Sequence, residues 1–558
     1  MLRVALAGSL LLILLLAAAA VRLPSVREDL TSARRGLIAA QESLRGGDAA
    51  GARERITAAS ADAGSAEAVT DGVLWRAARR LPGLGVPFEE VAAVAHVSAV
   101  VTRDVARPLG DVALAPPAWQ GRLDLAPLVA AQAPLRSADE ALVAATTTLR
   151  QAPRSRLGPL TSARTELTDE LTRLQGIVSG ARLAADVLPS LLGADGPRRY
   201  FVAVQNPAEP RATGGLIGAF AVLRAEGGRP VLEQVGSNNL LKDAPAPVVD
   251  LGPEHERRYG RFGSNRGWRA ANLSPDVPTV GRTLAALWRH RTGEQVDGVL
   301  LVDPQALAHL LQVTGPVTLP GGVRLTAENA VQELTIEVYR RFPRARDAER
   351  NDYLAQAARL VFTRLQQPGL DGRRLLEQAS RAVGTGHLSV WAADPAVQQR
   401  LAAAPVGGAL PGTSPYVRVV TQDAGGSKLG TYLRQDVDYA AAPTGEAVDL
   451  GAGPQPEEQG TVQVSLANTA PRGLPEYVTL RADAPDGRPR PRGQIKVWVS
   501  VYLGPRGTLL AATLDGRPVT MQAETERGHA VLSTFVSIDP GSTARLVLSV
   551  RQPTGDPR

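Results

Sequence analysis

The sequence contains no cysteine. This absence excludes a disulfide scaffold, an iron–sulfur cluster, a thiolate zinc site and a cysteine nucleophile. The chain also lacks a Gly-x-Ser-x-Gly elbow, a P-loop and a dinucleotide fingerprint, the motifs that mark many hydrolases and nucleotide-binding enzymes. Its six histidines are scattered without the paired spacing of a zinc site. No short catalytic motif therefore marks the function.

Lysine is nearly absent as well, at positions 242, 428 and 496 among 62 basic residues. So much arginine beside so much alanine is typical of a GC-rich genome, and a net charge of +7 over 558 residues is too small to indicate a nucleic-acid partner. With 21% charged and 44% hydrophobic residues the chain is globular. At roughly 150 residues per domain, its length predicts about three or four domains.

The amino terminus holds one long uncharged run, residues 4–21. Eighteen residues of helix span about 27 Å, close to the thickness of a bilayer core. Residues 1–24 are therefore predicted to be an uncleaved membrane anchor, or an export signal cleaved after the alanines at 18–20. We expect a single-pass protein of the cell membrane whose bulk is extracytoplasmic; the alternative is secretion after cleavage.

Downstream, the hydrophobic period changes twice. Residues 25–190 are predicted to form a helical stalk, with leucines every seven residues at first and an apolar stripe at helical spacing over 161–188. Residues 191–404 alternate short β-rich runs with helical stretches, which predicts an α/β domain. Residues 405–415 are a Pro- and Gly-rich linker.

The last part, residues 416–558, is predicted to be an all-β sandwich of immunoglobulin-like architecture. Its runs are rich in β-branched residues, and Asp515-Gly516 is a typical hairpin turn. The predicted fold class is thus multi-domain: an N-terminal transmembrane helix with an α-helical stalk, a central α/β domain and a C-terminal β-sandwich.

The densest polar stretch, residues 198–220, runs from a predicted strand through a turn into another strand. Polar groups at a strand end are where α/β domains place ligands, and a glycine pair lets backbone N–H groups approach an anion. The alternative is that the carboxylate and guanidinium pair and the glycines make a tight turn. The candidate binding residues here are Asn206, Glu209, Arg211, Gly214 and Gly215.

Three segments carry a family resemblance: residues 205–215 (QNPAEPRATGG), 268–276 (WRAANLSPD) and 296–304 (VDGVLLVDP). They resemble the domain of unknown function 4012, found in envelope proteins of actinobacteria and other bacteria. The resemblance covers about residue 188 to the end and implies a place in the cell envelope, but it implies no activity.

A more distant resemblance is to the LytR-CpsA-Psr phosphotransferases. The order of residues 296–302, 306–311, 314–317 and 325–330, followed by the arginine-rich stretch 340–350, is similar to the order in those enzymes. They move a glycopolymer from a polyprenyl-pyrophosphate carrier onto peptidoglycan. The resemblance implies a LytR-CpsA-Psr-like α/β domain in which guanidinium groups bind a diphosphate. The expected anion contacts are Arg211, Arg344, Arg346 and Arg350; the alternative for 340–350 is a solvated basic loop.

Two motifs of those enzymes, Arg-x-Asp and Pro-Arg-Asp, are replaced here by Arg211-Ala212-Thr213 and by residues 236–239 (GSNN), so the catalytic residues stay unknown. Asp276 is a candidate metal ligand, with helix capping as the alternative. The sequence implies no certain cofactor, and Mg²⁺ is expected only with a phosphotransferase. Residues 254–269 are predicted to form a mobile surface loop, either closing over a ligand or acting only as a connection.

We therefore expect a membrane-anchored extracytoplasmic envelope protein of uncertain activity that binds a lipid-linked or cell-wall glycan through its α/β domain. Its expected partners are the membrane and a polyprenyl-phosphate-linked glycan or peptidoglycan, without nucleic acid. One alternative is an active phosphotransferase that moves a glycopolymer from polyprenyl pyrophosphate to peptidoglycan. The other is a non-catalytic structural or adhesion protein that works through its β-sandwich.

Overall fold

The computed structural model describes residues 23–46, 48–82, 84–111, 119–343, 346–449, 454–483 and 491–554. The predicted anchor at residues 4–21 lies outside this part. Over the residues that are described, no helix is long and apolar enough to cross a membrane. Helix α2 (Leu23–Arg45), for example, has 23 residues but carries charged side chains along its length. The predicted fold class with a transmembrane helix is corrected accordingly: the described chain is a mixed α/β protein with a helical N-terminal region and several sheets.

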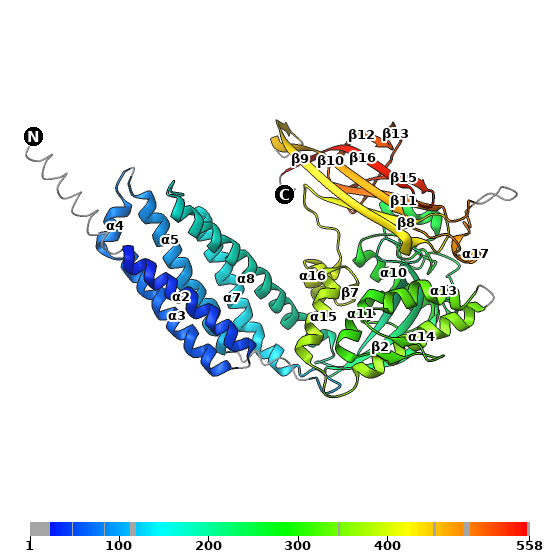
Figure 1. The fold of residues 1–558 in the computed structure, drawn as a ribbon, viewed down its shortest axis with the longest axis horizontal. Helices are drawn as coiled ribbons and strands as arrows, with labels where there is room; N and C mark the ends of the chain where they lie inside the picture. The colour runs from blue at the N-terminus through cyan, green and yellow to red at the C-terminus, as the bar shows by residue number, and fades with distance from the viewer. Residues whose placement is uncertain are drawn as a thin grey trace, which may run out of the picture. The chain divides into compact units, whose positions relative to one another are not determined.

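The chain divides into two compact units, one formed by residues 1–118 and 124–190 and the other by 119–123 and 191–558. The described part of the first unit is helical (Figure 1). After α2 its helices are α3 (Ala49–Thr70), α4 (Val73–Arg79), α5 (Val86–Val100), the π-helical stretch Val101–Ala106, α6 (Arg107–Asp111), α7 (Ala126–Gln151) and α8 (Gly158–Leu191).

Small side chains let the helices of the first unit pack closely. The buried positions of α2 are Val26, Ala33 and Ala40, a seven-residue repeat of its own that precedes the predicted leucine repeat by four residues. Ala33 packs in one cluster with Ala59 and Ala63 of α3. The helix predicted over 161–188 is confirmed as α8. These helices hold together through alanine-rich seams instead of large side chains.

The second unit begins with a five-stranded sheet of order β3-β2-β1-β4-β7. Strands β1 and β4 are parallel, with Val204 opposite Val302, and all other neighbours are antiparallel. Because the two parallel strands end at the same edge, the residues that follow them lie near one another. The strands are β1 (Arg198–Asn206), β2 (Leu216–Glu226), β3 (Arg229–Ser237), β4 (Gly298–Val302) and β7 (Leu388–Ala392).

Helices cover both faces of this sheet. On one face, Phe201 and Ala203 of β1 pack with Leu284 and Trp288 of α10 in one buried core. The other face, which carries Val202 and Val204, is covered by α11, α14 and α15. The helices are α9 (Pro253–Tyr259), α10 (Val277–Thr292), α11 (Pro304–Thr314), α12 (Ala330–Gln332), the π-helical stretch Glu333–Glu337, α13 (Val338–Arg341), α14 (Asp347–Leu365), α15 (Gly372–Gly384) and α16 (Pro395–Ala402).

The C-terminal strands form two antiparallel sheets, of order β13-β12-β16-β10-β9 and β14-β15-β11-β8. Valines and leucines of β10 and β16 in one sheet and of β11 and β15 in the other share one core. The predicted Asp515-Gly516 turn is confirmed, with positive φ at both residues as a type I′ hairpin requires. The strands, with helix α17 among them, are β8 (Val417–Asp423), β9 (Leu433–Asp449), β10 (Pro454–Asn468), α17 (Glu476–Thr479), β11 (Ile495–Pro505), β12 (Thr508–Leu514), β13 (Arg517–Pro518), β14 (Gln522–Glu526), β15 (His529–Ile538) and β16 (Thr543–Pro553).

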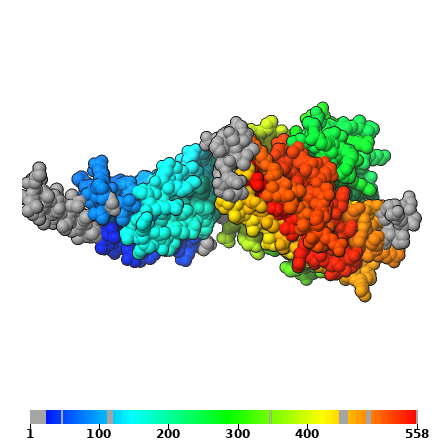
Figure 2. Space-filling view, turned by 90° about the horizontal axis from the view of Figure 1, so that it is seen from above, coloured from blue at the N-terminus to red at the C-terminus, as the bar shows by residue number. Residues whose placement is uncertain are grey.

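The two parts of the second unit share an extensive polar and apolar contact. Tyr259 and Leu273 of the α/β part pack with Trp498 of β11 in one buried cluster. In Figure 2 the orange and red residues of the C-terminal strands make a continuous surface that borders the green residues of the α/β part. Both parts therefore contribute side chains to the contact between them.

The α/β part also contains a minor hairpin of β5 (Val317–Thr318) and β6 (Arg324–Leu325).

Candidate functional site

An apolar pocket of about 300 Å³ lies between the five-stranded sheet and helices α11, α14 and α15. Aliphatic side chains from all of these elements form nearly the whole lining. Its floor is the sheet face that Val202 and Val204 of β1 share with Leu300 and Val302 of β4. The pocket exists because alanines and leucines of the three helices do not fill the space above these strands. Its helical lining includes Ala306, Leu307, Leu310, Leu354, Ala358, Val361, Phe362, Ala379 and Ala382.

Polar groups meet the pocket where the two parallel strands end. Asp303 follows β4, and its Oδ1 accepts hydrogen bonds from the backbone N–H groups of Gln305 and Ala306, which caps α11. Its Oδ2 lies 2.6 Å from Nδ1 of His387, the residue before β7. Asn206 ends β1 and lines the pocket as well. The edge of the sheet thus combines an apolar volume with carboxylate, imidazole and amide groups.

Asn206 connects the pocket to a group of cations and tyrosines. Its Nδ2 donates a hydrogen bond to the hydroxyl of Tyr339. The ring of Tyr339 lies 5.3 Å from the guanidinium carbon of Arg350 and 5.6 Å from Nζ of Lys428. Tyr477 contacts the same two cations, at 5.6 and 5.1 Å. We call this set, together with Glu209, the cation cluster: Asn206, Glu209, Tyr339, Arg350, Lys428 and Tyr477.

The cation cluster is largely enclosed. Lys428 forms an ion pair with Glu209, and their side chains are 12% and 15% exposed. Burial by itself would lower the pKa of Lys428, but its interactions with Glu209, Tyr339 and Tyr477 together outweigh burial, and the pKa is raised. Burial raises the pKa of Tyr339 to about 12. Lys428 and Arg350 therefore stay positively charged and Tyr339 stays protonated around neutral pH.

Arg211 lies beside this cluster but does not belong to it. Its guanidinium donates hydrogen bonds to the carbonyl oxygens of Pro210, at 2.9 Å, and of Asp423, at 3.4 Å. Burial raises the pKa of the Asp423 carboxyl to about 6, although the charge of Arg211 opposes that shift and Glu209 adds to it. Arg211 thus joins the β1–β2 turn to the end of β8.

Gly214 and Gly215 make the tight turn that the sequence offered as the alternative. A Cβ on Gly215 would lie 2.0 Å from the carbonyl oxygen of Asn206, and one on Gly214 would lie 2.7 Å from Oε1 of Gln205. Gly214 also has a φ of +139°. No side chain fits at either position, because the turn folds directly onto the end of β1.

The arginine-rich stretch divides in two. Arg350 is buried in the cation cluster, whereas Arg346 is exposed and pairs with Glu349 one turn along α14. Arg344 lies outside the described residues. Of the expected binding residues, the structure therefore brings together Asn206, Glu209 and Arg350, places Arg211 next to them, and leaves Arg346 apart.

Asp276 caps α10. Its Oδ2 accepts hydrogen bonds from the backbone N–H and the hydroxyl of Thr279, at 3.1 and 2.6 Å, and its Oδ1 accepts one from the N–H of Leu410. Among the residues that the structure describes, no three His, Cys, Asp or Glu side chains gather as a metal site. Because protein donors already occupy both carboxylate oxygens of Asp276, these surroundings do not fit Mg²⁺.

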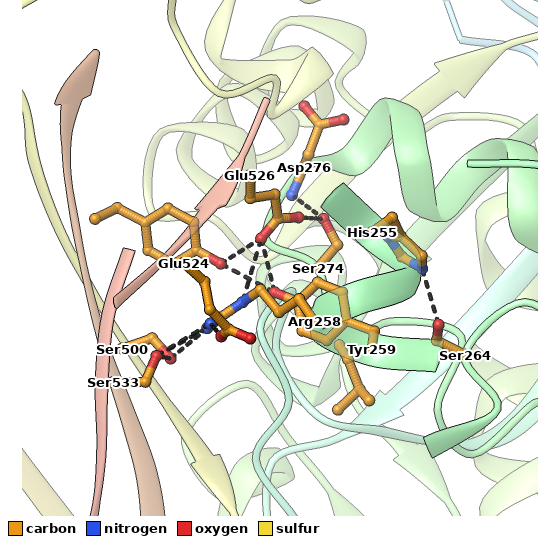
Figure 3. A network of polar contacts seen from close by, with 12 residues as sticks. His255, Arg258, Tyr259, Ser264, Ser274, Asp276, Ser500, Glu524, Glu526 and Ser533 are labelled. Atoms are coloured by element: carbon orange, nitrogen blue, oxygen red, sulfur yellow. Dashed lines mark hydrogen bonds and ion pairs between the residues drawn. The ribbon is translucent and has the colours of Figure 1, made fainter. Parts of the chain in front are cut away.

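A second polar network lies between α9 and the C-terminal strands (Figure 3). The fully buried guanidinium of Arg258 pairs with Glu524 and lies 3.7 Å from Glu526. It also donates to Ser500 Oγ at 2.7 Å. The hydroxyl of Tyr259 donates to Glu526 Oε2 at 2.7 Å. Burial raises the pKa of Glu526. These side chains bond to one another across the contact between the two parts.

This network corrects the interpretation of residues 254–269 as a mobile surface loop. The segment begins within α9, and His255, Arg258 and Tyr259 are all buried. Burial lowers the pKa of His255 to about 4, and its Nε2 lies 2.8 Å from Ser264 Oγ. Glycines and charges suggested a loop, but the partners that bury them come from strands more than 200 residues later in the chain.

Sequence reasoning missed the pocket and three members of the cation cluster: Tyr339, Lys428 and Tyr477. One signal was available for Lys428, which is one of only three lysines in a chain whose other basic residues are arginine. The pocket had no local signal, since its alanines and leucines are the residues of any helix core.

Comparison with known proteins supports part of the sequence interpretation. The model of the family described as "Protein of unknown function (DUF4012)" matches residues 195–339, which confirms that resemblance over strands β1 to β4 of the sheet and the chain up to the start of α13. No curated protein and no solved structure matches the chain. The matched segment includes Asn206, Glu209 and Tyr339, whereas Lys428 and Tyr477 lie beyond it.

Proposed function

We propose that this protein binds a lipid-linked glycan of the cell envelope, with the apolar chain of the lipid in the sheet–helix pocket. The single observation that carries the proposal is the pocket itself: a volume of about 300 Å³ with an almost wholly aliphatic lining. This volume is at the lower end of the range of about 300–1,000 Å³ for ligand pockets. It is also about twice an engineered protein cavity of about 150 Å³ that binds benzene.

Energetics argue for an occupant. The pocket is partly open, so its aliphatic lining is in contact with solvent when no ligand is bound. Covering apolar surface is favourable by about 25 cal/mol per Å². Ordered water would gain little there, since the lining offers few hydrogen-bond partners. An aliphatic chain recovers the lost packing contacts without needing polar partners.

The cation cluster suits the phosphate that links such a lipid to its sugar. Lys428 lies beside Glu209 in this cluster, the ring of Tyr339 contacts both Lys428 and Arg350, and Asn206 is common to the cluster and the pocket. A phosphate oxygen forms charge-assisted hydrogen bonds with ammonium and guanidinium groups. The chain would therefore lie over β1 and the phosphate beyond Asn206. The distant resemblance to LytR-CpsA-Psr proteins supports the same class of ligand.

A second candidate function is transfer of the glycan, and the contact between Asp303 and His387 favours it. A carboxylate that holds Nδ1–H of a histidine presents Nε2 as a base. His387 Nε2 would take the proton of an acceptor hydroxyl, whose oxygen forms a bond to the glycan-bearing phosphorus. The bond from that phosphorus to the bridging oxygen breaks, and polyprenyl monophosphate leaves. This step would make the protein a glycopolymer phosphotransferase.

The test compares farnesyl phosphate, farnesol and inorganic phosphate as ligands of the full-length protein, by calorimetric titration and thermal shift. We expect farnesyl phosphate to bind most tightly, farnesol more weakly, and phosphate weakest. Ala379→Phe fills the pocket from α15 and should abolish binding of both prenyl compounds. Ser380→Phe, at the exposed neighbouring position, is the matched control and should leave binding unchanged.

Two outcomes would contradict the proposal. Equal binding of inorganic phosphate and farnesyl phosphate would mean that the pocket does not hold the chain. Unchanged prenyl binding by a folded Ala379→Phe variant would place the ligand elsewhere. If no probe binds to the native protein, the result favours the alternative in which the C-terminal strands have a structural or adhesion role. For transfer, His387→Gln should stop turnover of a lipid-linked glycan while farnesyl phosphate still binds.

A further inference from the structure

One end of the helical unit carries an unusual number of exposed apolar side chains. Of the eleven large apolar residues exposed in the described part of this unit, six lie at the start of α2, in α4, around the start of α5 and just before α8. Val73 is 74% exposed and Leu157 is 53% exposed. We call this end the bundle tip; its exposed apolar residues are Leu23, Val73, Leu74, Leu84, Val86 and Leu157.

A buried cluster beneath the tip shows that these residues lie at one end. Val26, Trp75 and Phe88 pack in the same cluster, with Leu160 against it. Each of them comes two or three residues after an exposed member of the tip. The Trp75 ring meets the Phe88 ring edge on at 5.3 Å, and its Nε1 donates to the Phe88 carbonyl at 2.9 Å. Figure 1 shows α4 at an end of the bundle. The exposed residues therefore form an outer layer over one fixed cluster.

Exposed arginines accompany the apolar layer. Arg76 lies within α4, Arg80 follows it, and Arg154 and Arg156 precede Leu157. All four are exposed, and none forms an ion pair within the described residues. The nearby carboxylates Asp71 and Glu89 both pair with a different arginine, Arg79, at 3.6 and 3.2 Å. Two further acids, the exposed Glu28 and the half-buried Asp29, lie in the first turns of α2 beside Arg27. The tip thus has an excess of positive charge.

We propose that the bundle tip docks on the surface of an anionic lipid bilayer. Apolar side chains between cations fit such a surface, because the former enter the boundary between headgroups and acyl chains while the arginines meet lipid phosphates. The sequence supports this occupant independently, since the uncharged run 4–21 directly precedes Leu23. The chain therefore enters the structured bundle at the docking end. This surface is separate from the sheet–helix pocket and does not depend on the function proposed for it.

The absence of cysteine makes a direct test possible in the full-length protein. A polarity-sensitive fluorophore is attached to Val73→Cys at the tip, and separately to Val129→Cys, an exposed valine near the start of α7 outside the tip. The protein is then mixed with phosphatidylcholine vesicles with or without phosphatidylglycerol. With phosphatidylglycerol, the label at 73 should shift to the blue and become shielded from an aqueous quencher. The label at 129 should change in neither respect.

Charge is tested by the fourfold variant R76Q/R80Q/R154Q/R156Q. When this variant carries the label at position 73, the ratio of label shielded by the vesicles to label exposed to water should fall by about fivefold for each arginine removed. Arg136→Gln, at an exposed position on α7, is the control and should leave the ratio unchanged. An unaltered label at 73 in the presence of anionic vesicles would overturn the proposal. So would shielding that follows protein concentration without vesicles, which would identify an interface between copies of the chain.

Discussion

Two groups of buried cations join the α/β part to the C-terminal strands, and they differ in what surrounds them. Arg258 is fully buried, pairs with Glu524 and lies 3.7 Å from Glu526. It also donates to serine hydroxyls and lies over the Trp498 ring at 4.5 Å. Lys428 and Arg350 both contact the rings of Tyr339 and Tyr477, and Glu209 pairs with Lys428.

We infer that the difference separates a structural contact from the proposed binding site. Around Arg258 both carboxylates come from the protein itself. Around Lys428 and Arg350 the aromatic faces stabilise the cations by about 0.5–2 kcal/mol each. The cation cluster also shares Asn206 with the apolar pocket, which offers a place for an apolar group attached to an anion. The adjoining pocket, more than burial, distinguishes the two clusters.

The largest expected effect comes from Arg258→Met. It leaves Glu524 and Glu526 buried without their cation and should lower the free energy of unfolding by about 3–5 kcal/mol. Denaturant unfolding at neutral pH measures the loss. Arg257→Met, at the exposed neighbouring position of α9, is the control and should change stability by less than about 0.5 kcal/mol. Equal stability of both variants would show that the Arg258 network does not hold the two parts together.

Lys428→Met should have the next largest effect, a loss of about 2–3 kcal/mol, because it leaves Glu209 enclosed without a partner. Adding Glu209→Gln should restore most of that loss, whereas binding of farnesyl phosphate should stay weak in both variants. Lys242→Met, an exposed lysine, serves as control. If Glu209→Gln alone destabilises as much as Lys428→Met, the cluster is structural in the way that the Arg258 network is.

Local pattern was enough to predict much of the secondary structure. Leu167, Leu171, Leu174 and Val178 repeat at helical spacing, and the helix they predict is α8. Likewise the β-branched run 494–503 became β11. Such elements follow from contacts between residues close in sequence, which a single chain displays directly. The buried repeat of α2, Val26, Ala33 and Ala40, was harder to predict, because the leucines four residues after each of them are larger and more hydrophobic.

Long-range contacts explain what could not be predicted. Glu209 and Lys428 are 219 residues apart, and Arg258 and Glu524 are 266 apart. Periodicity contains no information about which loop of the α/β part meets which strand. For the same reason composition could not separate Arg350, which the C-terminal part buries, from Arg346, which points to solvent. The sequence therefore predicted a candidate site at the end of β1 without the residues that the structure places beside it, Tyr339, Lys428 and Tyr477.

Asp423→Asn tests how the free energy of unfolding depends on pH beside the cation cluster. The folded carboxyl has a pKa of about 6 against 3.8 for the free group, so the folded state keeps its proton to higher pH. Stability therefore falls as pH rises from about 3.8 to 6, by at most about 3 kcal/mol. Asparagine cannot ionise and should remove this fall, which raises stability at pH 7 by about 1–2 kcal/mol. A variant whose unfolding free energy still falls over that interval would contradict this assignment.

Tyr339→Phe has the smallest expected effect on stability and is the most specific test of the pocket end. The change removes one hydroxyl that accepts from Asn206, and a net loss of about 1 kcal/mol is expected because the ring and its contacts with Lys428 and Arg350 remain. Asn206 then has a free donor facing the pocket, which a phosphate oxygen can accept. Affinity for farnesyl phosphate should therefore hold or rise while affinity for farnesol stays constant. A parallel loss for both ligands would mean that Tyr339 shapes the apolar pocket and that its hydroxyl is not part of the phosphate end.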